Sequence, residues 1–419
     1  MSHEMFVRFL MRFFFVFFFV LSSLQRASAA DPGDLISMSY LGRYSVSALE
    51  VLNDEYYQLG ALGYLIQDEP DAGVQYAVDV YRVEYYTSDF NDALVIGSGL
   101  YADPVTSGLE KVVLYTHGTA VTIWDTPSNV SGVVFDGPTV LINVAGRGGR
   151  KLLMPDGTGF WTSTVPQHRY LMGEVEGRTA IDMWTAVQQS SVFVNDPPQG
   201  DLHLFGLSAG ALPALWAQRL YEAEGGTLAE VTLMGAVTAP EVFIEENLSK
   251  VGGYYRVYDA FALQAWINTS GGAVSASSVF KDPSSVASLF DMDHSYTEVI
   301  AGLKNTAGAT YRPGFLHDFE RNVNNPARVF LRASDAAVGW CPKAPIIFHH
   351  FEEDTEVSLE SVIAAQTALN TCFGSGGATL VTYDSTAVPL LAYPGAEHLE
   401  LWDNLLPEYA DGTLPGLTR

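Results

Sequence analysis

Short apolar runs alternate with helical segments along most of this sequence, and this alternation strongly constrains the fold. Residues 111–116 (KVVLYT), 201–205 (DLHLF) and 230–234 (EVTLM) are apolar runs of strand length, and helical patterns at 177–189 and 209–224 lie between them. Continuous apolar runs are typical of parallel strands buried on both faces. Strands that alternate with helices favour βαβ units. The sequence therefore predicts an α/β fold, a mostly parallel sheet flanked by helices.

Four further strands are predicted at 75–86, 139–144, 345–350 and 378–383. The first (QYAVDVYRVEYY) alternates with a period of two and indicates a half-exposed strand. The other three are short and apolar, as expected of buried strands. They extend the predicted sheet to both sides of the runs described above.

The chain has 419 residues, which exceeds the ~250–300 at which a single core usually stops growing. One large domain with an insertion, or two domains, is therefore expected. The segment after 240 is rich in helical pattern and is broken by Gly-Gly pairs, although it lies between two predicted strands. The expected order is a signal peptide (1–30), an N-terminal lead-in (31–73), the first part of an α/β core (74–240), an inserted, largely helical cap (241–341) and the second part of the core (342–419).

The first 30 residues have the pattern of a secretory signal. Arg8 and Arg12 lie in or beside a charged start, an apolar run follows from 13, and Ala-Ser-Ala-Ala ends the segment at 27–30. The alternative is a membrane anchor, but the apolar run ends by 24 and is much shorter than the ~20 residues of a spanning helix. The mature chain is expected to be exported, either extracellular or periplasmic, without stable membrane insertion.

The charge and the cysteines restrict the partners and the compartment. A formal net charge of −26 argues against nucleic acid and anionic membrane surfaces, both of which attract Lys/Arg patches. The same charge is also compatible with a simple role in solubility. Cys341 and Cys372 are the only cysteines, and in an exported protein such a pair predicts a structural disulfide bond.

The most informative motif is GLSAG at 206–210, a G-x-S-x-G pattern. It follows the predicted strand 201–205 and precedes a helix, which is the context of a nucleophile elbow. Such a turn strains the serine backbone and crowds its neighbours, so that Gly206 and Gly210 relieve the crowding. Ser208 is thus the predicted nucleophile, at a helix N-terminus that favours developing negative charge.

A serine hydroxyl needs a base, and in this fold the acid and the histidine follow the serine along the chain. His398 lies near the C-terminus in AYPGAEHLELW, after the last predicted strand. Of the other histidines after the serine, His294 and His317 fall in the predicted cap, and His349 and His350 fall in a strand pattern. His398 alone has both the order and the loop context, and is the predicted base.

The acid is expected in the turn after strand 345–350, where four carboxylates occur within five positions. Asp354 is the preferred residue, because a turn of a few residues after a strand end usually presents the acid. Glu353 is the second choice, and at least three of the four carboxylates are expected to be solvated. The acid would hold the imidazole tautomer and stabilise the imidazolium.

The oxyanion hole requires two backbone N–H donors. One is expected from Ala209, the residue after the nucleophile. The other is expected from the HG-type turn after strand 111–116, where Thr119 and Ala120 are equally good candidates. Trp124, on the same loop, could line an acyl pocket.

Two other motifs resemble binding sites for a nucleotide or a metal ion, but we do not expect either to bind one. The Gly-rich segment 146–149 lacks the Lys-Ser/Thr ending of a phosphate loop, which argues against nucleotide binding. Asp291, Asp293 and His294 could bind a metal ion, but such clusters usually face solvent. We therefore expect no cofactor and no metal.

Together these features resemble the secretory-lipase branch of the α/β hydrolases, which includes fungal lipase A-type enzymes. The resemblance extends over roughly residues 74–402 and implies that the insert is a cap over the acyl site and that the substrates are acyl esters or triacylglycerols. It rests on His117-Gly118, Asp182, the GLSAG elbow with MGAVTAPE after the next strand, Cys341, Asp354, Cys372 and Gly395-Ala396-Glu397-His398.

The function predicted from the sequence is a serine esterase or lipase that cleaves carboxylic esters through an acyl-enzyme. Its partner would be a small-molecule or lipid ester. One alternative is a secreted peptidase or aminopeptidase, because the same triad can cleave amides. Another is a non-catalytic binding protein with a hydrolase fold, against which the complete set of Ser, His and acid argues.

Overall fold

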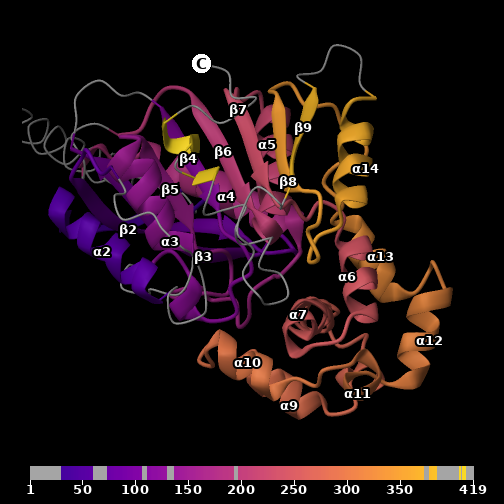
Figure 1. Ribbon diagram of the computed structural model, residues 1–419. Helices are drawn as coiled ribbons and strands as arrows, with labels where there is room; N and C mark the ends of the chain where they lie inside the picture. The colour runs from indigo at the N-terminus through magenta and orange to yellow at the C-terminus, as the bar shows by residue number, and fades with distance from the viewer. Residues whose placement is uncertain are drawn as a thin grey trace, which may run out of the picture. The chain divides into compact units, whose positions relative to one another are not determined.

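The computed structural model describes residues 30–59, 73–105, 111–129, 136–192, 197–371, 377–384, 405–406 and 408–411. Within this part of the chain, nine strands form one sheet in the order β1-β2-β3-β5-β4-β6-β7-β8-β9 (Figure 1). The strands are β1 (Leu35–Tyr44), β2 (Val78–Ser88), β3 (Leu94–Pro104), β4 (Val112–Thr116), β5 (Lys151–Pro155), β6 (Leu202–Leu207), β7 (Glu230–Met234), β8 (Ile346–Phe351) and β9 (Ala378–Tyr383).

The sheet is parallel from β5 to β9 and antiparallel at the β1 edge. β4 pairs in parallel with both β5 and β6, and the parallel pairing continues through β7, β8 and β9. β1, β2 and β3 form an antiparallel meander that joins β5. The predicted fold class, a mostly parallel α/β sheet flanked by helices, is confirmed. The sequence pattern did not predict β1, β3 or β5.

The prediction of a strand at residues 139–144 is wrong. These residues belong to α3 (Asp136–Val140) and to the π-helix η3 (Leu141–Arg147). Every residue from Leu141 to Gly146 is buried, and the Asn143 side chain donates to the Thr139 carbonyl, one helical turn earlier. A short apolar run buried on all sides has the same pattern in a strand and in a buried helix, so periodicity could not separate the two.

Two hydrophobic clusters lie on opposite faces of the sheet because successive strand residues point to opposite sides. Val112 and Leu114 of β4 belong to one cluster, and Val113 and Tyr115 belong to the other. The first cluster includes residues of α4 (Gly173–Gln188) and α5 (Ala211–Ala223). The second includes residues of α2 (Val46–Leu59), α3 and η3, together with Leu405, Leu406 and Tyr409. Burial on both faces explains why the central strands are continuously apolar.

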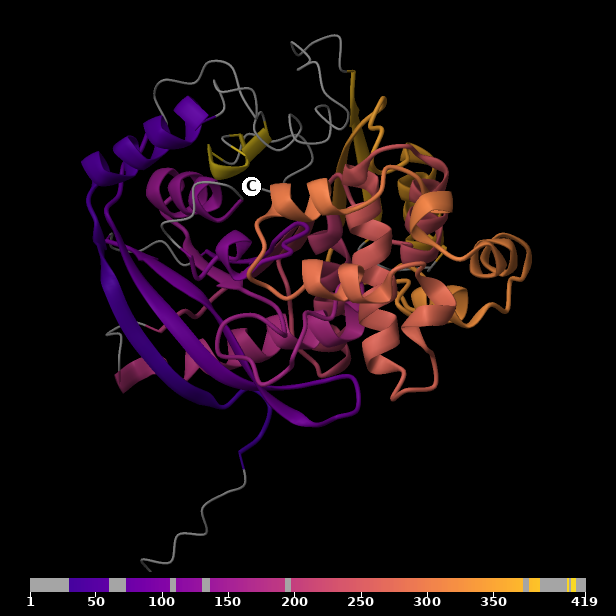
Figure 2. The same cartoon turned by 90° about the horizontal axis from the view of Figure 1, so that it is seen from below.

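A long helical segment separates β7 from β8. In Figure 1 these helices gather below the sheet, and Figure 2 shows them from below. The helices are α6 (Pro240–Ser249), α7 (Gly253–Thr269), α8 (Ala276–Val279), α9 (Pro283–Leu289), α10 (Tyr296–Gly302), α11 (Ala307–Thr310), α12 (Pro313–Arg321) and α13 (Pro326–Ala333). We call them the inserted helices. After β8, α14 (Leu359–Leu369) leads toward β9.

None of the helices in the described ranges is both long enough and apolar enough to cross a membrane.

Candidate active site

The turn between β6 and α5 has the backbone geometry of a nucleophile elbow. Ser208 directly follows β6, has φ +52° and begins a short 3-10 turn that leads into α5. A non-glycine residue in this left-handed region is uncommon, and such strain clusters at functional sites. The Ser208 side chain remains partly exposed, whereas the following residue, Ala209, is buried.

The two glycines of the motif are required by close backbone contacts. A Cβ at Gly206 would lie 2.8 Å from the Ala211 Cα and 2.8 Å from the Gly210 carbonyl oxygen. A Cβ at Gly210 would lie 2.1 Å from the Thr116 carbonyl oxygen. These distances are too short for any side chain, so the elbow depends on glycine at both positions.

The loop after β4 lies beside the elbow. β4 and β6 are parallel neighbours with Thr116 opposite Gly206, and the Thr116 hydroxyl donates to the Gly210 carbonyl at 2.7 Å. The predicted oxyanion residues Thr119 and Ala120 follow on this loop. Ala120 is buried, and the Thr119 hydroxyl lies 2.7 Å from the Tyr170 hydroxyl.

Trp124 lies further along the same loop, in the short 3-10 helix Ile123–Asp125, and is 54% exposed. It is not among the residues that line the pocket beside the elbow. Its predicted role in an acyl pocket therefore stays a prediction.

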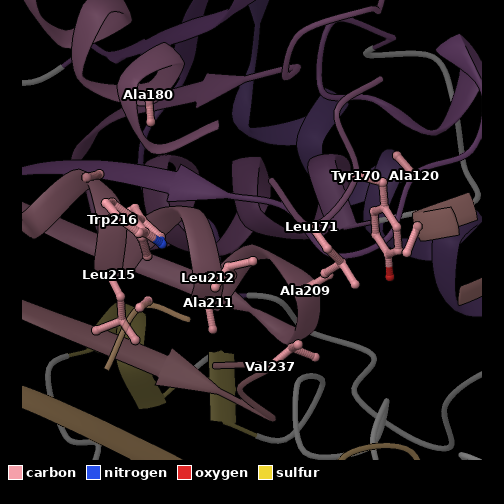
Figure 3. Packing of buried hydrophobic residues seen from close by; sticks show 14 of the residues in the cluster. Ala120, Tyr170, Leu171, Ala180, Ala209, Ala211, Leu212, Leu215, Trp216 and Val237 are labelled. Atoms are coloured by element: carbon pink, nitrogen blue, oxygen red, sulfur yellow. The ribbon is translucent and has the colours of Figure 1, made fainter. Parts of the chain in front are cut away.

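A pocket opens between the β4 loop, the start of α5 and the start of α4. Apolar residues near it pack together around the elbow, among them Tyr170, Leu171, Ala209 and Leu212 (Figure 3). The pocket is lined by Thr116, His117, Gly118, Pro155, Gly157, His168, Tyr170, Leu171, Met172, Gly173, Glu176, Ala209, Leu212 and Pro213. It therefore adjoins both Ala209 and the HG turn.

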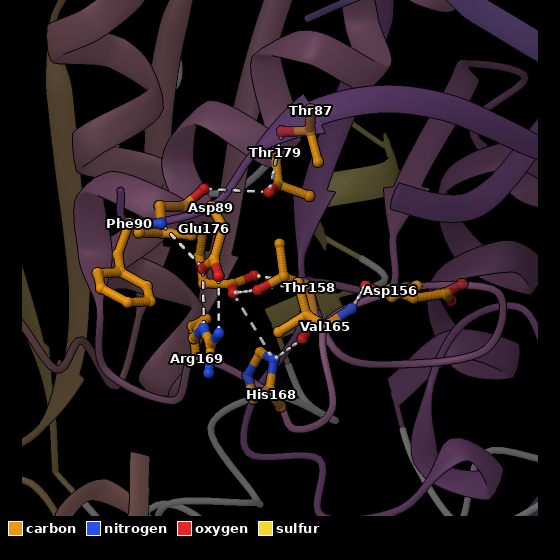
Figure 4. Close-up of polar contacts among 12 residues, drawn as sticks. Thr87, Asp89, Phe90, Asp156, Thr158, Val165, His168, Arg169, Glu176 and Thr179 are labelled. Atoms are coloured by element: carbon orange, nitrogen blue, oxygen red, sulfur yellow. Dashed lines mark hydrogen bonds and ion pairs between the residues drawn. The ribbon is translucent and has the colours of Figure 1, made fainter. Parts of the chain in front are cut away.

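His168 and Glu176 are buried polar groups in the wall of this pocket (Figure 4). His168 Nδ1 lies 2.8 Å from the Thr158 carbonyl and 3.7 Å from Glu176 Oε1, and the Thr158 hydroxyl donates to the same Glu176 oxygen at 2.5 Å. Burial lowers the pKa of His168 to about 3 and raises the pKa of Glu176 to about 8. Burial therefore favours the neutral form of both groups.

The sequence analysis did not select His168 or Glu176. A histidine and a glutamate eight positions apart at the start of a helix are common, and their spacing alone carries no catalytic signal. They come together because the turn after β5 folds back onto the first turn of α4 through Thr158. Only the tertiary structure brings them to the pocket.

We call residues 352–358, after β8, the acid turn. Its four carboxylates differ in burial. Glu352 and Glu353 are exposed. The Asp354 side chain is fully buried, and its Oδ1 accepts hydrogen bonds from the backbone N–H groups of Glu356 (2.8 Å) and Val357 (3.0 Å). At least three of the four carboxylates were expected to be solvated, but Glu356 is also buried, at 2% exposed. Asp354 is thus a buried carboxylate that is hydrogen-bonded by the backbone of its own turn, whereas Glu353 is exposed.

His398 and Cys372 lie outside the described residues, so their predicted roles stay predictions. Cys341 lies in the segment between the inserted helices and β8. A different histidine, His350, is completely buried in β8, with Nε2 3.0 Å from the Val357 carbonyl and 3.8 Å from Asp354 Oδ2. It thus contacts two residues of the acid turn, Asp354 and Val357.

Two other residues singled out in the sequence have structural contacts. Asp182, on α4, accepts a hydrogen bond from the Thr87 hydroxyl at 2.7 Å, and burial raises its pKa to about 6. It joins α4 to β2. His117 places its ring nitrogens 2.8 Å from the Gly118 carbonyl and 3.0 Å from the Asp156 carbonyl, which fixes the HG turn against the segment after β5.

The Asp291–His294 segment forms a local turn. Asp291 Oδ1 lies 2.8 Å from His294 Nδ1 and accepts the backbone N–H of Asp293 at 3.0 Å. In the part of the chain that the structure describes, no three His, Cys, Asp or Glu side chains are grouped as a metal site would require.

A comparison with models of known protein families finds no match, and neither does a comparison with curated proteins. Solved structures are similar. A protein of Legionella pneumophila has a TM-score of 0.76 at 18% identity, over 92% of this chain and 99% of that one. The rice cell wall degrading esterase LipA from Xanthomonas oryzae also has a TM-score of 0.76, at 20% identity, over 91% and 98%.

Candida antarctica lipase A, in its closed state, has a TM-score of 0.60 at 15% identity, over 93% of this chain and 84% of that one. These likenesses extend along nearly the whole chain. The chain therefore has the α/β-hydrolase fold, with an esterase and a lipase A among its structural neighbours.

Proposed function

We propose that this protein is a serine hydrolase that cleaves carboxylic esters through an acyl-enzyme. The observation that carries the proposal is the backbone of Ser208, held at φ +52° between a buried strand and a helix by two glycines that no other residue could replace. The esterase and lipase neighbours support ester substrates at the level of the fold.

In the proposed reaction, Ser208 Oγ attacks the ester carbonyl while His398 accepts the hydroxyl proton. The resulting oxyanion accepts hydrogen bonds from the backbone N–H of Ala209 and of Thr119 or Ala120. Collapse of this intermediate breaks the bond to the alcohol oxygen, to which His398 returns the proton. Asp354 holds the imidazole in the required tautomer.

The second half of the reaction regenerates the enzyme. Water attacks the acyl group on Ser208, and His398 accepts a proton from it. The second tetrahedral intermediate then collapses, and His398 protonates the departing Ser208 oxygen. The products are one carboxylic acid and one alcohol, with no cofactor consumed.

The proposal includes the setting of the site. We propose that residues 1–30 direct export and are removed, that Cys341 and Cys372 form a disulfide bond, and that residues 241–341 act as a cap over the acyl site. The position of the inserted helices between β7 and β8, next to the acid turn, supports the role of a cap.

A substrate panel tests the proposal. Purified protein would be assayed with p-nitrophenyl acetate, butyrate and octanoate and with aminoacyl p-nitroanilides, alongside Ser208→Ala and the control Ser288→Ala, which alters an exposed serine of α9. We expect ester hydrolysis that falls by about 10³-fold or more in Ser208→Ala alone. Faster cleavage of the anilides than of the esters would favour the peptidase alternative.

A further inference from the structure

Two of the inserted helices hold the acid turn. Lys250, just after α6, donates from Nζ to the backbone carbonyls of Thr355 (2.8 Å) and Glu356 (3.1 Å). From α7, the Tyr254 hydroxyl donates to Glu356 Oε1 at 2.5 Å, and the Tyr258 hydroxyl donates to Oε2 at 2.7 Å. Both oxygens of one buried carboxylate are therefore bonded to a single helix of the insertion.

This carboxylate depends on its tyrosines. Glu356 is 2% exposed, and a buried carboxylate without hydrogen-bond donors would be very costly. Burial, together with the charge of Glu356, raises the pKa of both Tyr254 and Tyr258 well above its ordinary value, so both hydroxyls remain protonated donors.

The same residue contacts the acid through its backbone. The Glu356 N–H donates to Asp354 Oδ1 at 2.8 Å, and the adjacent Val357 N–H donates to that oxygen at 3.0 Å. Rotation or displacement of this short segment would move both donors together. The orientation of the Asp354 carboxylate is therefore linked to the position of Glu356.

We propose that Glu356 is a positioning residue, through which Tyr254 and Tyr258 of the inserted helices fix the orientation of the catalytic acid Asp354. This inference rests on the proposed function, because it assumes that Asp354 orients the catalytic histidine. It gives the insertion a second task besides covering the acyl site: the acid is aligned only when α7 is packed against its turn.

A matched control is available within the insertion. Tyr311 is also fully buried, and its hydroxyl also donates to a buried carboxylate, that of Asp259. Both residues lie in the inserted segment, and the hydrogen bond that joins them does not involve the acid turn. Tyr311→Phe therefore removes the same kind of hydrogen bond from the same helical segment without changing the support of Asp354.

The experiment compares Tyr254→Phe/Tyr258→Phe with Tyr311→Phe, using p-nitrophenyl butyrate. We expect the double variant to lose about 10-fold in kcat, less than the ~10²-fold that a 1 Å misplacement can cost, with KM little changed. Tyr311→Phe should keep kcat within about 2-fold, since ordinary buried hydrogen bonds affect stability and not catalytic alignment. Thermal melts establish that all variants are folded, and Glu356→Gln, which keeps one acceptor oxygen, should lose less than the double variant.

Two further measurements separate positioning from general destabilisation. The acid limb of the kcat/KM profile reports the base in the free enzyme. It should move to lower pH in the double variant, because a misaligned Asp354 stabilises the imidazolium less. In an Asp354→Asn background, the two Tyr→Phe changes should cost less than about 2-fold more, because interacting residues are not additive.

The outcomes are distinguishable. If Asp354→Asn keeps wild-type activity, the acid assignment in the proposed function is wrong and the inference fails with it. If Asp354→Asn is impaired but the tyrosine double variant behaves like Tyr311→Phe, only the inference is wrong. A full 10-fold loss from the tyrosine changes in the Asp354→Asn background would also overturn it.

Discussion

The turn that carries Ser208 and the turn that carries Asp354 are fixed by different parts of the molecule. At Ser208 the constraint is backbone packing within the sheet: Gly210 lies against the Thr116 carbonyl of the neighbouring strand. At Asp354 the constraint comes from side chains of the inserted helices, which bond to Glu356 beside it. The Ser208 turn is thus placed by packing within the sheet, whereas the Asp354 turn also depends on the inserted helices.

The two turns also differ in electrostatics. The pocket beside the elbow contains His168 and Glu176, whose neutral forms are favoured by burial. The acid turn is instead surrounded by strong donors, with two tyrosine hydroxyls and the Lys250 ammonium within hydrogen-bond distance. Substitutions at the elbow should therefore disturb packing, whereas substitutions at the acid turn should disturb the orientation of the Asp354 carboxylate. The predictions that follow test this difference.

The largest effect is expected at the acid itself. Asp354→Asn should fold normally and lose about 10²–10⁴-fold in kcat, because the imidazole tautomer is no longer held. The matched change Glu353→Gln alters an exposed carboxylate one position earlier and should lose less than ~10-fold. Steady-state kinetics on p-nitrophenyl butyrate decide between them. An impaired Glu353→Gln beside an active Asp354→Asn would place the acid one residue earlier.

A disulfide bond between Cys341 and Cys372 should also stabilise the segment that contains the acid turn. Cys341 and Cys372 are 31 positions apart, and a bridge across that loop would contribute roughly 3–4 kcal/mol by loop closure. Urea unfolding with and without reductant measures the difference, and the Cys341→Ser/Cys372→Ser variant should match the reduced wild type. Two free thiols on titration of the unfolded, unreduced protein would refute the bridge.

At the elbow, a single methyl group should be harmful. Gly210→Ala would place Cβ 2.1 Å from a backbone oxygen, and overpacking of this kind costs about 1–3 kcal/mol or more. Gly308→Ala, in α11 with nothing within 4 Å, should instead be neutral or stabilise the protein by up to about 1 kcal/mol. Unfolding midpoints of the two variants give the comparison. Equal stability would contradict the steric account of the elbow.

Burial of Glu176 should change the pH dependence of stability. The pKa of Glu176 is raised by burial to about 8 when folded, so the folded state binds its proton more tightly than the unfolded state does. This contribution to stability is complete at low pH and is lost as the pH rises through about 4.5 toward 8, with a slope of at most about 1.4 kcal/mol per pH unit. Glu176→Gln should lack this decline. If the free energies of unfolding of the variant and the wild type depend on pH in the same way between pH 5 and 8, Glu176 is not neutral in the folded protein.

The sequence was most informative where local pattern and tertiary structure agree. The runs at β4, β6 and β7 are apolar because both faces of these strands are buried, and G-x-S-x-G states the requirement for glycine at the elbow directly. β1 was missed because half of its residues are exposed and only Met38 is buried, so that it has no apolar period. At residues 139–144, an apolar run suited a buried helix as well as a strand.

The acid turn shows the limit of local reasoning. Position after a strand end selects Asp354 as the predicted acid from four neighbouring carboxylates. It could not show that Glu356 is buried, because the groups that bury it, Tyr254 and Tyr258, lie about 100 positions earlier in an irregular helical segment. His168 was missed for the same reason. Its place in the pocket wall depends on contacts with Thr158 and Glu176, which cannot be predicted from the spacing of these residues in the sequence.

Covalent labelling tests the central claim, that Ser208 is the nucleophile, most directly. The protein would be treated with a fluorophosphonate, and the site of the adduct would be found by peptide mass mapping. We expect one adduct, on Ser208, in the wild type, the same adduct formed more slowly in Asp354→Asn, and none in Ser208→Ala. Labelling that persists in Ser208→Ala, or an adduct that maps to another serine, would contradict the claim.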